Sequence, residues 1–326
     1  MDLAQFVNTL GQDLLRRYGE RVHKVCIDAG FNCPNRDGRL GVGGCTFCNN
    51  DSFIPGQNDR PGIHEQVRTG AVAVERVTGA RKLLAYFQAY TNTYADVELL
   101  KDLYQQALLQ DHVVGISVGT RPDCVPDPVL DLLASIQEQG HLVWLELGLQ
   151  SSFDETLQAV NRGHDYACYV DAIQRAHERG LKVCTHLILG LPGEGPEHAR
   201  TTLQRVLQLG VEGLKLHPLH VVKATRLAFQ WRRGEYEPMQ QQDYIDLVVD
   251  LIRRTPRDVI FHRLTGTASH DLLLAPAWCE HKWAVINGIS GLMAREGWHQ
   301  GDLSLKDQIY REPLSSDRML RLGTTA

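Results

Sequence analysis

The sequence predicts an α/β protein: a partial (β/α)6 barrel of parallel strands, with an N-terminal helix and a C-terminal α/β extension. Strand-like segments alternate with amphipathic helical segments of about 10–15 residues, the pattern of βαβ units. Right-handed crossovers between such units close a parallel sheet into a full or partial barrel. Polar or glycine-rich residues follow each strand, where a barrel carries its active site. The length of 326 residues accommodates a large barrel with an appendage.

The first element is a predicted helix at 3–18, because its apolar residues recur at helical spacing. These residues are Leu3, Phe6, Val7, Leu10, Leu14 and Leu15. We assign residues 1–20 to this helix, 21–222 to the core barrel and 223–326 to a C-terminal extension that completes the fold.

Six apolar segments then predict the strands of the barrel, and a candidate seventh strand follows at 258–262. The six strands lie at 22–28, 82–88, 113–118, 142–147, 181–189 and 213–217. The helical segments lie at 64–79, 95–110, 127–139, 154–179, 196–209 and 240–254.

Composition indicates a soluble protein of the reducing cytoplasm. Apolar residues make up 43% and charged residues 22%, and the net charge of −5 gives no global sign of nucleic-acid binding. Eight cysteines without a signal peptide favour free thiols. No run approaches the roughly 18 apolar residues that span a bilayer, so we expect no membrane contact.

The chemistry concentrates in the loop after the first strand, where Cys33, Cys45 and Cys48 have the spacing C-x11-C-x2-C. Clustered cysteines in an enzyme-like chain indicate iron–sulfur or zinc, because thiolate sulfur is a soft ligand. Three protein ligands leave a position open for chemistry, whereas four close a structural site. Phe47 offers an apolar face beside the open position. The pattern therefore favours an open iron–sulfur site.

Cys26, seven residues before Cys33, leaves an alternative open. As a fourth ligand it would create a closed four-cysteine zinc site on a non-catalytic binding scaffold. We favour the other interpretation, in which Cys26 is a small buried residue of the core.

The strand ends carry motifs that resemble a known family. They are Cys33-Pro-Asn-Arg-Asp-Gly, Gly43-Gly-Cys-Thr-Phe-Cys48, Tyr86-Phe-Gln-Ala-Tyr-Thr-Asn-Thr-Tyr94, Gly119-Thr-Arg-Pro-Asp123, Leu145-Glu-Leu-Gly-Leu-Gln-Ser151 and His186-Leu-Ile-Leu-Gly-Leu-Pro-Gly-Glu194. These motifs resemble the radical S-adenosylmethionine (SAM) superfamily, and in particular its YhcC-type branch, which is related to the radical domain of the Elongator catalytic subunit. The likeness covers nearly the whole chain, including 262–266 and 278–282.

The resemblance implies a radical SAM enzyme. Cys33, Cys45 and Cys48 would hold three irons of a [4Fe–4S] cluster, and the fourth iron would bind SAM. One electron would cleave SAM to methionine and a 5′-deoxyadenosyl radical, which abstracts hydrogen from an unidentified substrate. A flavodoxin or ferredoxin would supply the electron. An RNA or tRNA base, a small metabolite or a protein would be the substrate.

The resemblance also implies roles for residues at the strand ends. Gln150 and Arg162 match residues that hold the SAM carboxylate in oxygen-independent coproporphyrinogen oxidases, and Arg162 suits a carboxylate because it binds in a bidentate manner. His186 matches a position that touches the ribose. The superfamily usually has a Gly-Gly-Glu run after the second strand, and residues 88–92 replace it in this chain. Gln88 and Thr91 are therefore the candidates for binding the SAM amino group.

Phe47, Ser117 and Thr120 complete the residues that we expect beside the cofactor.

Three further features have both a functional and a structural interpretation. His217 and His220 are either donors to a substrate or ordinary hydrogen-bonded histidines. Glu146 is either an acid of the site or a satisfied structural acid. The segment 226–233 interleaves arginines with aromatic residues, which is typical of an RNA-binding strip or of a solvated amphipathic helix.

Overall fold

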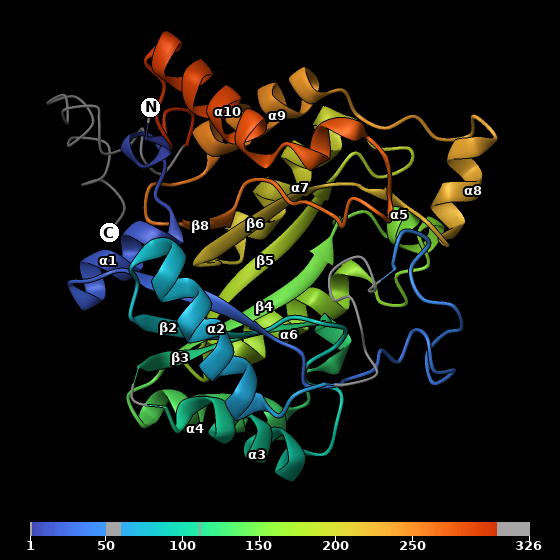
Figure 1. Ribbon diagram of the computed structural model, residues 1–326. Coiled ribbons are helices and arrows are strands. Elements are labelled where there is room, and N and C mark those ends of the chain that lie inside the picture. The colour runs from blue at the N-terminus through green and yellow to red at the C-terminus, as the bar shows by residue number, and fades with distance from the viewer. Residues whose placement is uncertain (1, 50–59, 111, 305–326) are drawn as a thin grey trace, which may run out of the picture.

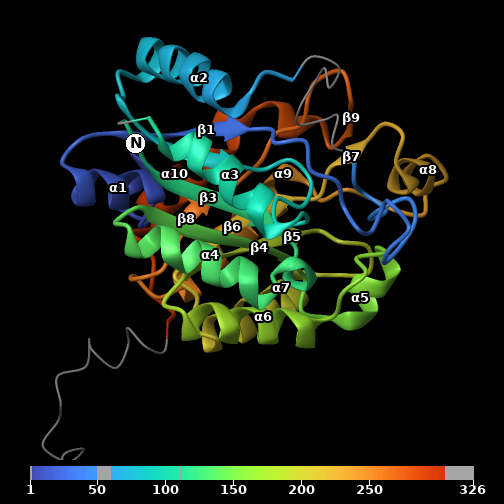
Figure 2. The same ribbon diagram turned by 90° about the horizontal axis from the view of Figure 1, so that it is seen from below.

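The core of the protein is one curled parallel sheet. The computed structural model describes residues 2–49, 60–110 and 112–304. Its seven-stranded sheet has the order β1-β2-β3-β4-β5-β6-β8 and forms a half-barrel with β1 and β8 at the edges (Figures 1 and 2). The strands are β1 (Val22–Ile27), β2 (Lys82–Phe87), β3 (Val113–Thr120), β4 (Leu142–Gln150), β5 (Lys182–Leu189), β6 (Gly213–Pro218) and β8 (Ile260–Arg263).

The predicted partial barrel is confirmed, and its candidate seventh strand is present as β8. This strand pairs in parallel with β6, so the half-barrel has seven strands rather than six. A second, two-stranded sheet that the sequence analysis did not predict pairs β7 (Val221–Val222) with β9 (Leu273–Ala275) in antiparallel fashion.

Helices cover the outer face of the sheet, as Figures 1 and 2 show. They are α2 (Ile63–Thr78), α3 (Val97–Leu108), α4 (Asp127–Glu138), α6 (Tyr166–Glu178), α7 (Pro196–Gln208) and α9 (Gln241–Arg254). The helix α10 (Lys282–Glu296) packs against α9, and α5 (Asp154–Ala159) and α8 (Arg226–Arg232) lie at the end where the strands terminate. The predicted helical segment 154–179 comprises α5 and α6, because Asp165 starts α6 by accepting from the Cys168 N–H at 2.8 Å. No helix in the described ranges is long and apolar enough to cross a membrane.

The single N-terminal helix predicted at 3–18 is wrong. A short 3-10 turn covers Leu3–Gln5, and α1 (Leu10–Tyr18) begins only after Thr9. The backbone of Thr9 is extended and bridges to Phe261 of β8, while the Thr9 hydroxyl accepts from the Gln12 N–H. The segment therefore pairs with the edge of the sheet before it turns into a capped helix.

The helix α1 seals the end of the half-barrel from which the strands begin. Leu10 and Leu14 pack there against side chains from the sheet, which are Val22, Leu84, Leu142, Trp144, Cys184 and Ile260. This apolar plug leaves the opposite end, where the strands terminate, for polar groups. In both views the cysteine loop lies at that end beside α8, and the Leu227 N–H donates to the Thr46 carbonyl at 2.9 Å (Figures 1 and 2).

At Gly115, the strands β3 and β4 approach each other too closely to leave room for a side chain. A Cβ at this position would lie 1.9 Å from the carbonyl oxygen of Leu142 in β4. We expect Gly115→Ala to lower the free energy of unfolding by about 1–3 kcal/mol in a urea titration, because backbone must move. In the control Gly291→Ala, where the added Cβ in α10 meets nothing within 4 Å, stability should rise by about 0.5–1 kcal/mol. Equal effects of the two substitutions would contradict this packing.

Candidate active site

A cavity opens at the carboxyl ends of the strands, and all three loop cysteines, Cys33, Cys45 and Cys48, line it. Seven of the residues predicted to bind the cofactor also line it: Phe47, Gln88, Thr91, Thr120, Gln150, Arg162 and His186. Ser117 lies deeper in the barrel, where its fully buried hydroxyl donates to Glu146. The fold therefore brings the predicted residues together, with Ser117 beneath the others.

The cysteine loop is held by the segment that follows α5. Asn35 Nδ2 donates to the carbonyl of Asn161 at 2.6 Å, and Asn161 Nδ2 donates back to the carbonyl of Gly44 at 2.7 Å. The Thr46 N–H also donates to the carbonyl of Val160 at 2.9 Å. These reciprocal contacts fix the loop without any bond to sulfur.

The thiols have distinct surroundings. Cys45 is buried, and its Sγ accepts hydrogen bonds from Arg162 Nη1 at 3.5 Å and Asn35 Nδ2 at 3.7 Å. Burial raises the pKa of the Cys48 thiol to about 12, and the neighbouring Cys45 acts in the same direction. Cys33 is half-buried.

Cys26 does not join the other three cysteines. The prediction that it is a small buried core residue is wrong, because its side chain is exposed. Side chains alternate along a strand, so Cys26 faces the same side of β1 as Lys24, which points into the half-barrel. Since β1 is an edge strand, this inner face remains open to solvent. Among the described residues, no three His, Cys, Asp or Glu side chains are arranged to hold a single metal ion, so the zinc alternative gains no support.

Gly148 allows Arg162 and Gln150 to meet at the end of β4. Arg162 is 7% exposed, and its Nη2 donates to the Gly148 carbonyl at 2.6 Å. A Cβ on Gly148 would lie 2.8 Å from both Arg162 Nη2 and Gln150 Nε2. The register between β4 and β5 shifts between Gly148 and Gln150, and Gln150 adopts a positive φ of 79°. This irregularity re-aims the end of the strand toward the cavity.

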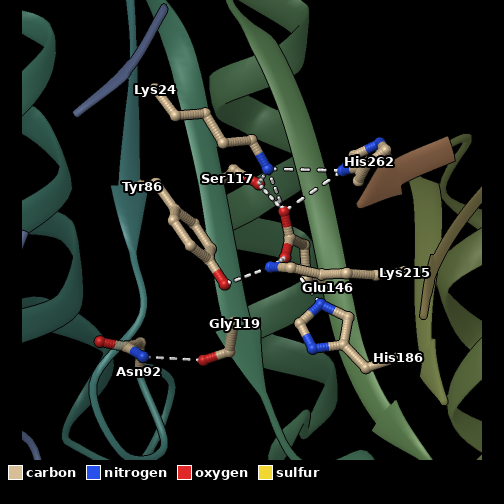
Figure 3. A network of polar contacts seen from close by, with 9 residues as sticks. All are labelled: Lys24, Tyr86, Asn92, Ser117, Gly119, Glu146, His186, Lys215 and His262. Carbon is tan, nitrogen blue, oxygen red and sulfur yellow. Dashed lines mark hydrogen bonds and ion pairs between the residues drawn. The ribbon is translucent and has the colours of Figure 1, made fainter. Parts of the chain in front are cut away.

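The loop after β2 carries Gln88 and Thr91 and is anchored to β3. Asn92 Nδ2 donates to the Gly119 carbonyl at 2.8 Å (Figure 3). The Tyr104 hydroxyl donates to the Asn92 carbonyl at 2.6 Å, and the Thr91 N–H donates to the Asn32 carbonyl at 3.2 Å. This anchoring holds the loop against the segment that precedes Cys33.

Beneath the cavity lies a polar layer to which each of the seven strands contributes one residue (Figure 3). We call it the Glu146 layer, and its members are Lys24, Tyr86, Ser117, Glu146, His186, Lys215 and His262. The Glu146 carboxylate is fully buried and contacts Lys24 at 2.5 Å, Ser117 at 2.6 Å, Lys215 and His186 at 2.7 Å each, and His262 at 3.3 Å. Lys215 also donates to the Tyr86 hydroxyl at 2.6 Å.

The charges of the Glu146 layer are set by burial and by the two lysines. Burial opposes ionisation of Glu146, but Lys215 and Lys24 outweigh it and hold the pKa of Glu146 well below its ordinary value. Burial lowers the pKa of Lys215 to about 8, of His186 to about 3 and of His262 to about 4. At neutral pH the layer therefore combines one carboxylate and charged lysines with two neutral imidazoles.

The tautomer of His186 follows from its partner. Its Nε2 lies 2.7 Å from a carboxylate oxygen of Glu146, which only accepts, so Nε2 carries the hydrogen. The Nδ1 of this neutral ring is then an acceptor. Because His186 lines the cavity, this acceptor is available to a hydroxyl group of a ligand.

Several members of the site were missed in the sequence. Lys24 and Lys215 lie within predicted strands, Val22-His-Lys-Val-Cys-Ile and Gly213-Leu-Lys-Leu-His217. Lys215 stands between two leucines, and a lysine in such an apolar run needs an internal partner, which was the available signal. His262 and Arg263 lie in the segment 262–266 that shares the family likeness, but their strand was only a candidate and no role was predicted for them.

Known proteins resemble this chain in sequence and fold. A model described as "Radical SAM superfamily" matches residues 33–206, and one described as the radical SAM C-terminal domain matches 211–295. The chain is 52% identical to Protein YhcC of Escherichia coli over 87% of its own length and 91% of that protein. It is 28% identical to tRNA uridine(34) acetyltransferase of Methanocaldococcus jannaschii over 41% of its own length and 25% of that protein. The solved structure of Methanocaldococcus infernus Elp3 shares the fold with a TM-score of 0.62 and 18% identity, over 86% of this chain and 64% of that one.

The buried neutral imidazoles predict a loss of stability in acid. Unfolded histidines bind protons below about pH 6.5, whereas His186 and His262 stay neutral in the fold until the pH approaches about 3 and 4. The unfolded state thus binds more protons between about pH 6.5 and 4, so stability is full above this window and falls as pH falls through it.

The free energy of unfolding should therefore be measured by urea titration from pH 7 to 4. We expect His262→Gln to reduce the slope by up to about 1.4 kcal/mol per pH unit, the value for one proton. The control His270→Gln changes an 83% exposed side chain and should leave the slope as in the wild type. Parallel curves for wild type and His262→Gln would contradict the neutral state of this ring.

Proposed function

The chain belongs to the radical SAM superfamily, as its motifs predicted, and we propose that it is an enzyme that abstracts hydrogen from its substrate with a [4Fe–4S] cluster and SAM. The observation that carries this proposal is that Cys33, Cys45 and Cys48 line one cavity together with Gln150 and Arg162. When bound, the cluster would pass one electron from an external reductant to the SAM sulfonium, and SAM would yield methionine and a 5′-deoxyadenosyl radical that takes a hydrogen atom from the substrate.

The cysteine loop suits a cluster with one open iron. Three thiols face the cavity, and Cys26, the candidate fourth ligand, lies on the open edge of β1. Hydrogen bonds to sulfur are one of the means by which a protein sets a cluster's reduction potential. The donors Arg162 Nη1 and Asn35 Nδ2 on Cys45 Sγ would act in this way.

Arg162 and Gln150 are the groups that we propose to bind the SAM carboxylate. Arg162 Nε is buried and has no hydrogen-bond partner in the described part of the chain. A guanidinium with a free donor at this depth matches a carboxylate better than it matches a neutral group. Gln88, Thr91, Thr120 and Phe47 remain candidates for the rest of the cofactor.

The Glu146 layer would form the floor beneath the ribose. It holds His186 in one tautomer, so that Nδ1 accepts from a hydroxyl group, and burial keeps this ring neutral. Ser117 would support this floor through its hydrogen bond to Glu146, without touching the cofactor itself.

The substrate and the electron donor complete the proposal. Radical chemistry of this kind needs a one-electron reductant, for which a flavodoxin or ferredoxin is suited. The name of the acetyltransferase relative refers to tRNA, which keeps an RNA base among the substrate classes. The strip at 226–233 corresponds to α8, on which Phe229 is 63% exposed, and its contact with RNA stays a prediction.

Cysteine variants test the cluster. Replacement of Cys33, Cys45 or Cys48 by Ala should abolish cluster assembly, because two thiolates cannot hold three irons. After anaerobic reconstitution, iron, sulfide and the visible spectrum should show about four irons in the wild type and few in these variants, and dithionite should drive SAM cleavage only in the wild type. Cys26→Ser is the control and should keep its iron. A colourless protein with one tight zinc that Cys26→Ser releases would establish the zinc alternative instead.

Gly148→Ala tests the SAM contacts. The added methyl would displace the ends of Arg162 and Gln150, which are flexible side chains, so the fold and the iron content should survive. We expect SAM to bind about tenfold more weakly or worse, which corresponds to the loss of one charge-assisted hydrogen bond. Equilibrium dialysis of the reconstituted protein measures this affinity. Gly11→Ala, whose added Cβ meets nothing within 4 Å, should bind SAM as the wild type does, and unchanged affinity in Gly148→Ala would exclude this pair as the carboxylate site.

A further inference from the structure

The wall of the cavity carries only positive charge. Among its lining residues that the structure describes, none is aspartate or glutamate, and the charged ones are Arg36, Arg121, Arg162, Lys215 and Arg263. A recessed site with charges of one sign concentrates ligands of the opposite sign. A cation of this wall that has no negative partner of its own therefore indicates where a negatively charged ligand binds.

Three of these cations lie on the side of the cysteine loop. Arg162 donates to Cys45 Sγ at 3.5 Å, and Arg36 donates to the Cys48 carbonyl at 3.5 Å. Arg121 is held by both oxygens of Asp123 at 2.8 and 2.7 Å. Under the proposed function, thiolates, cluster and SAM carboxylate supply the negative charge on this side, and these cations need no further ligand.

Lys215 and Arg263 lie on the opposite wall, on neighbouring strands and directly across from each other in register. Lys215 is satisfied by Glu146 at 2.7 Å and by the Tyr86 hydroxyl at 2.6 Å. Arg263 is half-buried and makes no hydrogen bond or ion pair with any residue in the described ranges. It is therefore a cation in the cavity without a counter-ion among the residues that the structure describes.

A β-bulge aims this side chain inward. The pairing passes from Leu214 with Phe261 to Lys215 with Arg263, so β8 contributes one extra residue, His262. His262 contacts Glu146 and Arg263 lines the cavity, which means that two consecutive residues face the interior. In a regular strand they would point to opposite faces. Bulges beside active sites re-aim side chains in this manner.

His217 and His220 stand beside this wall, with ring centroids 4.5 Å apart. His217 Nδ1 donates to the Pro218 carbonyl at 2.7 Å. His220 is 5% exposed, and its ring hydrogen-bonds to the backbone of Gly266. Both histidines therefore have partners of their own and leave Arg263 as the group on this wall without one.

We propose that Arg263 binds an anionic group of the substrate, a carboxylate or a phosphate of a small molecule. The inference rests on the proposed function, because it assigns the cysteine side of the cavity to the cluster and SAM. A guanidinium matches both anions in a bidentate manner. The site lies on the inner wall of the half-barrel, which suits one anionic group rather than the backbone of a polyanion.

Calorimetric titration of the reconstituted holoenzyme tests this site. Inorganic phosphate and succinate serve as separate probes at constant ionic strength, with SAM saturating and no reductant, so that the cysteine side is occupied. We expect at least one probe to bind with a one-to-one stoichiometry, and the tighter probe identifies the anion. Arg263→Gln should weaken that binding about tenfold or more, and Arg263→Lys should restore part of it, because it keeps the charge but loses the fork. The matched control is Arg233→Gln at the exposed residue that follows α8, and it should bind as the wild type does.

The outcomes separate this inference from the proposed function. Iron content and dithionite-driven SAM cleavage are measured on the same samples and should be unchanged in Arg263→Gln. If cleavage is normal but neither probe binds the wild type, or both bind Arg263→Gln equally well, the anion site is refuted and the radical SAM proposal stands. If SAM cleavage fails in the wild type while the anion still binds through Arg263, the radical SAM proposal is refuted and the anion site stands. Binding of a tRNA fraction that depends on Arg263, with no binding of either small anion, would refute the small-molecule substrate.

Discussion

The buried carboxylate of Glu146 is the interaction on which the interior of this half-barrel depends. A charge removed from water is tolerated only when hydrogen-bonded partners surround it, and here the partners come from β1, β3, β5, β6 and β8. A slip of one residue in any of these strands would turn its side chain to the outer face and leave the carboxylate short of a donor. The polar contact therefore constrains the register of the whole sheet as well as the chemistry above it.

The Glu146 layer also separates two environments. Below it, Leu10 and Leu14 of α1 close the barrel with apolar contacts. Above it, the cavity is lined by cysteines and cations. His186 belongs to both sides, since its Nε2 is used by Glu146 and its ring lines the cavity. A change in the charge of the layer would thus be transmitted to a ligand in the cavity through the hydrogen-bonding state of one imidazole.

The sequence was informative where function is carried by consecutive residues. The parallel βαβ alternation, the cysteine loop and the cavity positions of Gln150, Arg162 and His186 could be predicted, because alternation and local motifs specify them. The Glu146 layer could not be predicted, since its members lie up to 238 positions apart in the sequence. Only the folded sheet brings Lys24 next to His262. The N-terminal helix was predicted too long for a related reason. Thr9 pairs with Phe261, and no local pattern shows a partner so distant in the chain.

The half-barrel has two free edges, β1 and β8, and they account for both the wrong prediction of a buried Cys26 and the position of Arg263. Cys26 was expected to be buried, as it would be in a complete barrel, yet the inner face of β1 is open to solvent. At the other edge, the bulge in β8 places Arg263 on the inner wall, and no strand follows β8 in the sheet to supply a partner. An inward cation at such an edge can be reached by a ligand, whereas the same residue inside a closed barrel would need a partner from the protein, as Lys215 has in Glu146. Incomplete closure thus leaves one cationic wall free for a substrate while the Glu146 layer keeps the remainder of the interior neutralised.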